Sequence, residues 1–193
     1  MNIRYFLEFI KPNKIDKFLK NISSGNNDIC ICAGDIGNPL NSNNHYDIFM
    51  NFISKNFKKS FIIAGNHEYY NNSKTIQEMN LFLIDYFKQF NNITFLNNSY
   101  EYYENYCFIG TTLWSKITNP NYKINDMYNI THFDYIQYNE LNKISKDFLQ
   151  ESLQEVIDNI QYIVITHHLL SNSLINDKYK TVKMLPYSQC FLF

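Results

Sequence analysis

The chain has 193 residues, a length that suits one domain with a sizeable core, and we expect a single domain over residues 1–193. Its 45% hydrophobic content, with 16 Tyr and 16 Phe, excludes a disordered chain. The formal net charge of −1 provides no basic field, so neither nucleic acid nor an anionic membrane is indicated as a partner.

The N-terminus and the cysteines bear on cellular location. The apolar run YFLEFI is short and carries Glu8, which argues against a signal peptide and against a membrane-spanning helix. No CxxC pair occurs, and Cys30 and Cys32 alternate along a strand-like run, so reduced core thiols are favoured over a zinc site or a disulfide. We therefore expect an intracellular, cytoplasmic protein.

The first quarter of the chain alternates helix and strand patterns. Apolar residues at helical spacing predict a helix over 14–22, with Asn13 as its candidate cap, and a second helix over 45–57. The continuous apolar runs DICICAG (28–34) and SFIIAG (60–65) predict two buried strands.

A third helix follows, and then three short strands. Thr75 and Glu78 can form a capping box, and the apolar period continues to about Phe90. Its inward positions are predicted to be Ile76, Met79, Leu83, Tyr86 and Phe90. The β-like runs are ITFL (93–96), YEYY (100–103) and CFIG (107–110).

The last third begins with a Tyr- and Asn-rich stretch, 119–139, that matches no element and is interpreted as a lid or an insertion. Residues 140–159 predict a long helix that leads into the strand QYIVIT (161–166). The helix is expected to turn inward Ile144, Phe148, Leu149, Leu153, Val156 and Ile157. Strands that alternate with helices, and that are apolar throughout, favour an α/β fold with both sheet faces covered.

Polar residues follow three of the predicted buried strands. ICICAGD ends in Asp35, FIIAGNHE ends in Asn66, His67 and Glu68, and YIVITHH ends in a pair of histidines at 167 and 168. Ligands of α/β sheets bind outside the carboxyl ends of strands, so these side chains are candidates for one site.

Two interpretations explain these residue types. A carboxylate, an amide oxygen and an imidazole form a mixed donor set that suits Mn, Fe or Zn. Alternatively, GD and GN are ordinary turn pairs, and both histidines are buried hydrogen-bonding residues. Because polar residues of these types follow all three strands, the metal-site interpretation is favoured.

In this order, GDIG, GNHE and THH resemble the motifs of the calcineurin-like metallophosphoesterases, and CFIGTTLW is similar to a segment of one branch of that family. The resemblance implies an α/β fold in which a layered sandwich of mixed β-sheets is flanked by helices. It also implies hydrolysis of phosphate mono- or diesters by a metal-bound hydroxide held between two ions.

The resemblance also implies roles for individual residues. Asp35 would bridge both metal ions, and Asn66 and His167 would bind the second ion. His67 would not be a ligand; it would stabilise the transition state or protonate the leaving oxygen. Structural roles are expected for the remaining residues. Glu68 would support the ligands from behind, and His168 would support its neighbour or pack in the core. Trp114 and Tyr69 would pack in the core, and His45 and His132 would lie at the surface or at a helix edge.

Two motifs of the family are absent from the sequence. Neither the opening Asp-x-His nor the closing GHxH occurs, and no histidine follows His168. We therefore expect a C-terminally truncated sandwich that binds at most one divalent ion, with phosphoesterase activity as the first hypothesis. The alternative hypothesis is an impaired relative that acts as a binding module or has no function.

Overall fold

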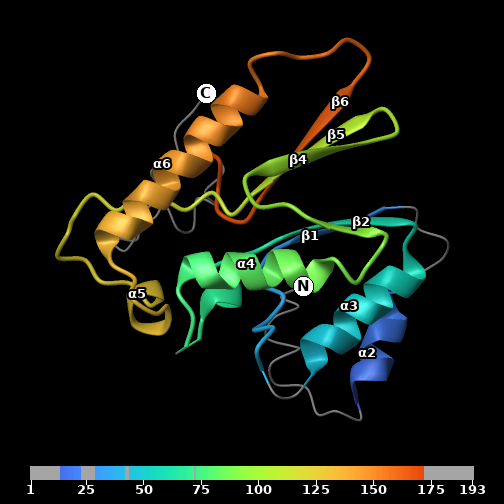
Figure 1. Ribbon diagram of the computed structural model, residues 1–193, viewed down its shortest axis with the longest axis horizontal. Helices are drawn as coiled ribbons and strands as arrows, with labels where there is room; N and C mark the ends of the chain where they lie inside the picture. Colours follow the sequence, from blue (N-terminus) through green and yellow to red (C-terminus); the bar gives the residue numbers. More distant parts are fainter. Residues whose placement is uncertain (1–13, 23–28, 42–43, 72, 172–193) are drawn as a thin grey trace.

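The computed structural model describes residues 14–22, 29–41, 44–71 and 73–171 (Figure 1). The candidate cap Asn13, Glu8, Cys190 and the tail beyond Ser171 lie outside the described residues. The helices are α2 (Ile15–Ile22), α3 (His45–Asn56), the short 3-10 helix η2 (His67–Tyr69), α4 (Ile76–Phe87), α5 (Asp126–Asn129) and α6 (Tyr135–Ser152). The strands are β1 (Ile29–Ala33), β2 (Lys59–Ile63), β3 (Ile93–Phe95), β4 (Ser99–Tyr103), β5 (Tyr106–Thr111) and β6 (Gln161–Thr166).

The described strands form two sheets of three strands each. The first is parallel in the order β1-β2-β3, with Ala33 of β1 beside Ile63 of β2. The second is mixed in the order β4-β5-β6, because β4 and β5 form an antiparallel hairpin and β6 pairs with β5 in parallel. Thr166 of β6 is level with Thr111 of β5, so β6 ends beside the end of β5.

The two sheets pack against each other through alternate residues of their strands. Phe61 of β2 stacks on Phe108 of β5 with ring centroids 3.8 Å apart. Ile63, Leu96 and Ile165 complete this inner cluster. Residues with the opposite orientation, such as Ile62, face the helices, which explains why the strands are apolar throughout.

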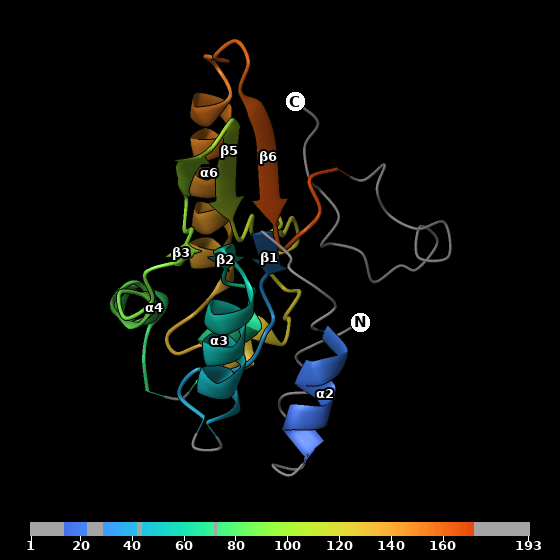
Figure 2. The same ribbon diagram turned by 90° about the vertical axis from the view of Figure 1, so that its right-hand side faces the viewer.

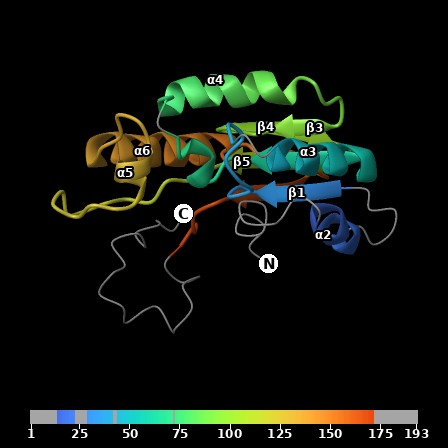
Figure 3. The ribbon, with the colours of Figure 1, turned by 90° about the horizontal axis from the view of Figure 1, so that it is seen from below.

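Helices cover the outer face of each sheet. α3 contacts β2 and α4 contacts β3, and the largest core cluster lies between these helices and the first sheet. α6 runs along the second sheet (Figures 1 and 2), where Leu149 packs against Cys107 and Ile109. Seen from below, α4 and α2 lie on opposite sides of β1 (Figure 3). The result is the layered α/β sandwich with mixed sheets that the sequence predicts.

The predicted capping box of α4 is present. The Thr75 hydroxyl accepts a hydrogen bond from the Glu78 backbone N–H at 3.3 Å, and the Glu78 carboxylate accepts one from the Thr75 N–H at 2.8 Å. Ile76, Met79 and Leu83 are buried, as their spacing indicates. Tyr86 is only half-buried, and Phe90 lies beyond the helix, which ends at Phe87. Local sequence therefore determines where this helix begins and which face it buries.

The prediction for the last helix was wrong at both ends. α6 starts at Tyr135, because the Asp134 carboxylate caps it by accepting the N–H groups of Ile136 and Gln137, and it ends at Ser152. Three residues expected to point inward are instead exposed: Ile144, Val156 and Ile157. Val156 and Ile157 lie beyond Ser152, the last residue of α6, so helical spacing does not determine where their side chains point.

Other expectations concern single residues. His45, expected at the surface or a helix edge, is buried at the first position of α3, so only the helix-edge part is correct. His132 is exposed, whereas Trp114 and Tyr69 are buried, as expected. Among the residues that the structure describes, no helix has the length and apolar character to cross a membrane.

Candidate functional site

Two glycines allow the ends of β1 and β2 to meet at the site. Gly34 has φ +80, and a Cβ on it would collide with the backbone of Gly65. A Cβ on Gly65 would lie 2.6 Å from the Asp35 backbone nitrogen and 2.8 Å from His167 Cε1. Asp35, which directly follows Gly34, has a left-handed φ of 54°. This conformation costs free energy in a residue other than glycine. The chain therefore places Asp35 here against its local preference.

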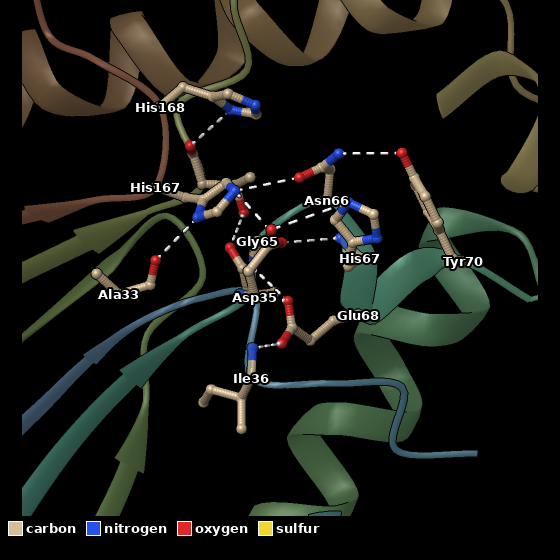
Figure 4. Close-up of polar contacts among 12 residues, drawn as sticks. Ala33, Asp35, Ile36, Gly65, Asn66, His67, Glu68, Tyr70, His167 and His168 are labelled. Atoms are coloured by element: carbon tan, nitrogen blue, oxygen red, sulfur yellow. Dashed lines mark hydrogen bonds and ion pairs between the residues drawn. The ribbon is translucent and has the colours of Figure 1, made fainter. Parts of the chain in front are cut away.

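The structure brings three predicted ligands together (Figure 4). His167 Nε2 lies 3.3 Å from Asp35 Oδ1 and 3.1 Å from Asn66 Oδ1. The three side chains follow β1, β2 and β6, so their meeting depends on the packing of the two sheets. A carboxylate oxygen, an amide oxygen and an imidazole nitrogen thus face a common point.

The hydrogen bonds of the His167 ring show that this point suits a cation. Nδ1 lies 2.9 Å from the carbonyl oxygen of Ala33, and because a carbonyl only accepts, Nδ1 carries the proton. Nε2 then faces two oxygens that also only accept. A neutral ring would set its lone pair against theirs, whereas a second proton or a metal ion satisfies all three atoms. A backbone carbonyl behind the ring is also the usual support of a metal-binding histidine.

His67 lies on the other side of Asp35. Its Nε2 is 3.9 Å from Asp35 Oδ2, and its backbone N–H donates to Asp35 Oδ1 at 3.1 Å. Its ring packs on that of Tyr70, with centroids 4.0 Å apart. His67 therefore lies beside Asp35, and its ring takes no part in the contacts that join His167 to Asp35 and Asn66.

Glu68 connects the loops that carry the ligands. It is buried, and its two carboxylate oxygens accept four backbone N–H groups: those of Asp35, Ile36, Gly37 and Gly65. Burial raises the pKa of Glu68, Asp35 raises it further, and the N–H donors oppose both effects. Glu68 thus has the structural role expected of it.

His168 is half-buried beside the site and packs against the core residue Trp114. Its ring lies 5.8 Å from that of Trp114, and its Nδ1 is 3.3 Å from the carbonyl oxygen of Thr112. Burial lowers the pKa of His168 to about 4, and the neighbouring His167 adds to the effect. His168 is therefore neutral near pH 7.

Two further residues of this region were missed by sequence reasoning. Asp126 is buried at the start of α5, and its Oδ1 accepts hydrogen bonds from Asn66 Nδ2 at 2.7 Å and from the Tyr70 hydroxyl. Asp126 lies in the stretch 119–139 that had no assignment, and no local pattern relates it to GNHE. Tyr70 directly follows GNHEY and could have been suspected from its position.

Nowhere in the described ranges do three or more His, Cys, Asp or Glu side chains form a group that could hold a metal ion. The candidate site therefore depends on an amide oxygen, that of Asn66, as its third donor. Oxygen and nitrogen donors of this kind suit Mn, Fe or Zn. The donor set and the tautomer of His167 both fit a divalent cation.

Three comparisons relate the chain to known proteins. An uncharacterized protein, L509, of Acanthamoeba polyphaga mimivirus is 33% identical over 172 residues, which cover 78% of this chain and 60% of that protein's length. The crystal structure of the phosphopantetheinyl hydrolase PptH of Mycobacterium tuberculosis matches with a TM-score of 0.63 at 12% identity, covering 87% of this chain and 68% of PptH, so the two share a fold. The family model described as calcineurin-like phosphoesterase matches residues 9–187. This match extends over most of the sequence and includes all three strand-end motifs, so the chain belongs to the calcineurin-like phosphoesterase family.

Proposed function

We propose that the chain binds one divalent transition-metal ion between Asp35, Asn66 and His167 and hydrolyses phosphate mono- or diesters. The observation that carries the proposal is the environment of His167 Nε2, which faces two accepting oxygens at 3.1 and 3.3 Å while Nδ1 donates to Ala33. Family membership supports the reaction class.

Each residue has a distinct part in this proposal. A divalent ion bound here would supply Lewis-acid stabilisation of charge on phosphoryl oxygens and would activate water. Asp35, Asn66 and His167 hold the ion's position, and the Ala33 carbonyl holds the His167 ring in the tautomer that leaves Nε2 available. The Tyr70 ring packs on His67. In the proposed reaction His67 would donate a proton to the leaving oxygen or a hydrogen bond to the transition state.

Metal binding is the first test. The full chain would be dialysed against chelator and titrated with Mn²⁺ and Zn²⁺ by calorimetry. We expect at most one tightly bound ion per chain and a lower affinity in His167→Ala, with exposed His132→Ala as the matched control. Two tightly bound ions, or an unchanged affinity in His167→Ala, would contradict the proposed ligand set.

Catalysis is the second test. Hydrolysis of an activated aryl phosphomonoester and an aryl phosphodiester would be measured in Mn²⁺. Asp35→Asn should abolish the activity, and His67→Ala should lower it by on the order of 10²-fold. If wild type binds the ion and inorganic phosphate but hydrolyses neither ester, the chain acts as a binding module and the phosphoesterase proposal is wrong.

A further inference from the structure

We propose that Asp126, together with Tyr70, is a positioning residue that orients the Asn66 amide so that its oxygen faces His167. The inference rests on the proposed function, because it concerns the residue that would present an amide oxygen to the metal ion. It assigns a role to α5, which belongs to neither of the strand-end loops that carry GDIG and GNHE.

The hydrogen bonds around Asn66 allow one orientation of its amide. Nδ2 donates to Asp126 Oδ1 at 2.7 Å and to the Tyr70 hydroxyl oxygen at 3.2 Å, so both N–H groups are used. The Tyr70 hydroxyl donates its own proton to Asp126 Oδ1. A flipped amide would set its oxygen against the Asp126 carboxylate, two acceptors in contact, and would turn its N–H groups toward His167.

The orientation of the Asn66 amide matters because an amide binds a cation through its oxygen and not through its NH₂ group. With Nδ2 held by Asp126, Oδ1 points to His167 Nε2 at 3.1 Å (Figure 4). The arrangement is thus formed in advance of any ligand.

Asp126 is itself held firmly against the turn that carries Asn66. Ile124 and Ile130, on either side of α5, are buried in the main core. Ile130 forms a parallel β-bridge with Asn71, and the Thr131 hydroxyl donates to the Asn71 carbonyl at 3.0 Å. The α5 segment is therefore attached to residues just beyond GNHE, and it brings a buried carboxylate to the back of the site.

Two substitutions at Asp126 separate positioning from charge. Both bonds end on Oδ1, so an amide oxygen in Asp126→Asn can accept them. Asp126→Ala removes the shorter of the two hydrogen bonds of Asn66 Nδ2 and leaves only the Tyr70 hydroxyl as its acceptor. We expect Asp126→Ala to weaken Mn²⁺ binding by about 10- to 100-fold. Asp126→Asn should retain most of the affinity, and Tyr70→Phe, which keeps the ring on His67, should fall between them.

A purely structural role for Asp126 needs its own control. Asn92 donates to the carbonyls of Ser54 and Phe57 near the start of β2, the end of the strand opposite to the site. Asn92→Ala should lower the thermal midpoint and leave Mn²⁺ affinity unchanged. If Asn92→Ala weakens binding as much as Asp126→Ala, the effect is one of stability and the inference is overturned.

The experiment combines calorimetric titration of Mn²⁺ with NMR of the metal-free chain. The Asn66 side-chain NH₂ signals, identified by their loss in Asn66→Asp, should exchange slowly in wild type and in Asp126→Asn and rapidly in Asp126→Ala. If wild type and Asp126→Ala bind Mn²⁺ equally, the inference is overturned while the proposed function stands. If wild type binds no Mn²⁺, the proposed function fails, and the NMR result alone decides: slow exchange that is lost in Asp126→Ala supports the inference, and any other pattern overturns it.

Discussion

Replacement of Glu68 by Gln should destabilise the protein, because one carboxylate joins the two loops that follow β1 and β2. Oε1 accepts the N–H groups of Ile36 and Gly37 at 2.6 and 3.2 Å, and Oε2 accepts those of Asp35 and Gly65 at 2.9 and 2.7 Å. A glutamine has only one oxygen, so two buried N–H groups would face its NH₂ group.

The size of the effect follows from those two groups. A buried donor without its acceptor costs about 1–3 kcal/mol, which gives about 2–6 kcal/mol for the pair. Removal of the charge recovers part of this cost, because burial raises the pKa of Glu68 and so disfavours its charged form. We expect a net loss of about 2 kcal/mol, a large share of the 5–15 kcal/mol that stabilises a typical domain.

Urea denaturation of wild type and Glu68→Gln would measure this loss, and Mn²⁺ titration would show whether the site survives. At about 2–4 °C per kcal/mol, the thermal midpoint should fall by at least about 4 °C. The control is Glu140→Gln on the exposed face of α6, which should change stability by less than about 0.5 kcal/mol. A Glu68→Gln variant as stable as wild type would refute the reasoning, because its four donors would then not need a carboxylate.

Three further predictions concern other residues. Gly65→Ala places a methyl group 2.8 Å from His167 Cε1 and should lower Mn²⁺ affinity by at least about 10-fold; normal binding in calorimetry would contradict the packing described here. The pKa of Cys30 is lowered by its hydrogen bond with Cys32, so mass spectrometry should find iodoacetamide on Cys30 before the other described cysteines, and modification of buried Cys107 first would count against this. Burial holds the pKa of His168 at about 4, below its ordinary value of 6.5, so the unfolded chain binds a proton more readily between these values. In the metal-free chain, the contribution of His168 to the free energy of unfolding should be fully present above pH 6.5. It should fall by up to about 3 kcal/mol toward pH 4, and this loss should be absent in His168→Phe.

The sequence by itself determined most of the local structure and the positions of the motifs. Apolar runs predicted β1, β2 and β6, and the Thr75–Glu78 pair predicted the start of α4, because each of these signals lies within a few neighbouring residues. The rule that ligands gather at the carboxyl ends of strands indicated the polar residues after these strands, and the family resemblance then assigned Asp35, Asn66 and His167 as ligands. The structure brings Asp35 and Asn66 within 3.3 and 3.1 Å of His167 Nε2. The boundaries of α6 were misread, because the apolar period extends beyond Ser152 while the cap at Asp134 lies in a segment without apolar period.

Only the tertiary structure decided how those side chains are held. The tautomer of the His167 ring depends on the carbonyl of Ala33, which is 134 positions away in the chain. The orientation of Asn66 depends on Asp126, which is 60 positions away in a segment that carries no periodic pattern. Such contacts leave no local signal, because an aspartate in a polar loop has the same sequence appearance whether it is solvated or buried against an amide. The fold alone brings α5 against the turn after β2, and so it alone determines which polar groups complete the site.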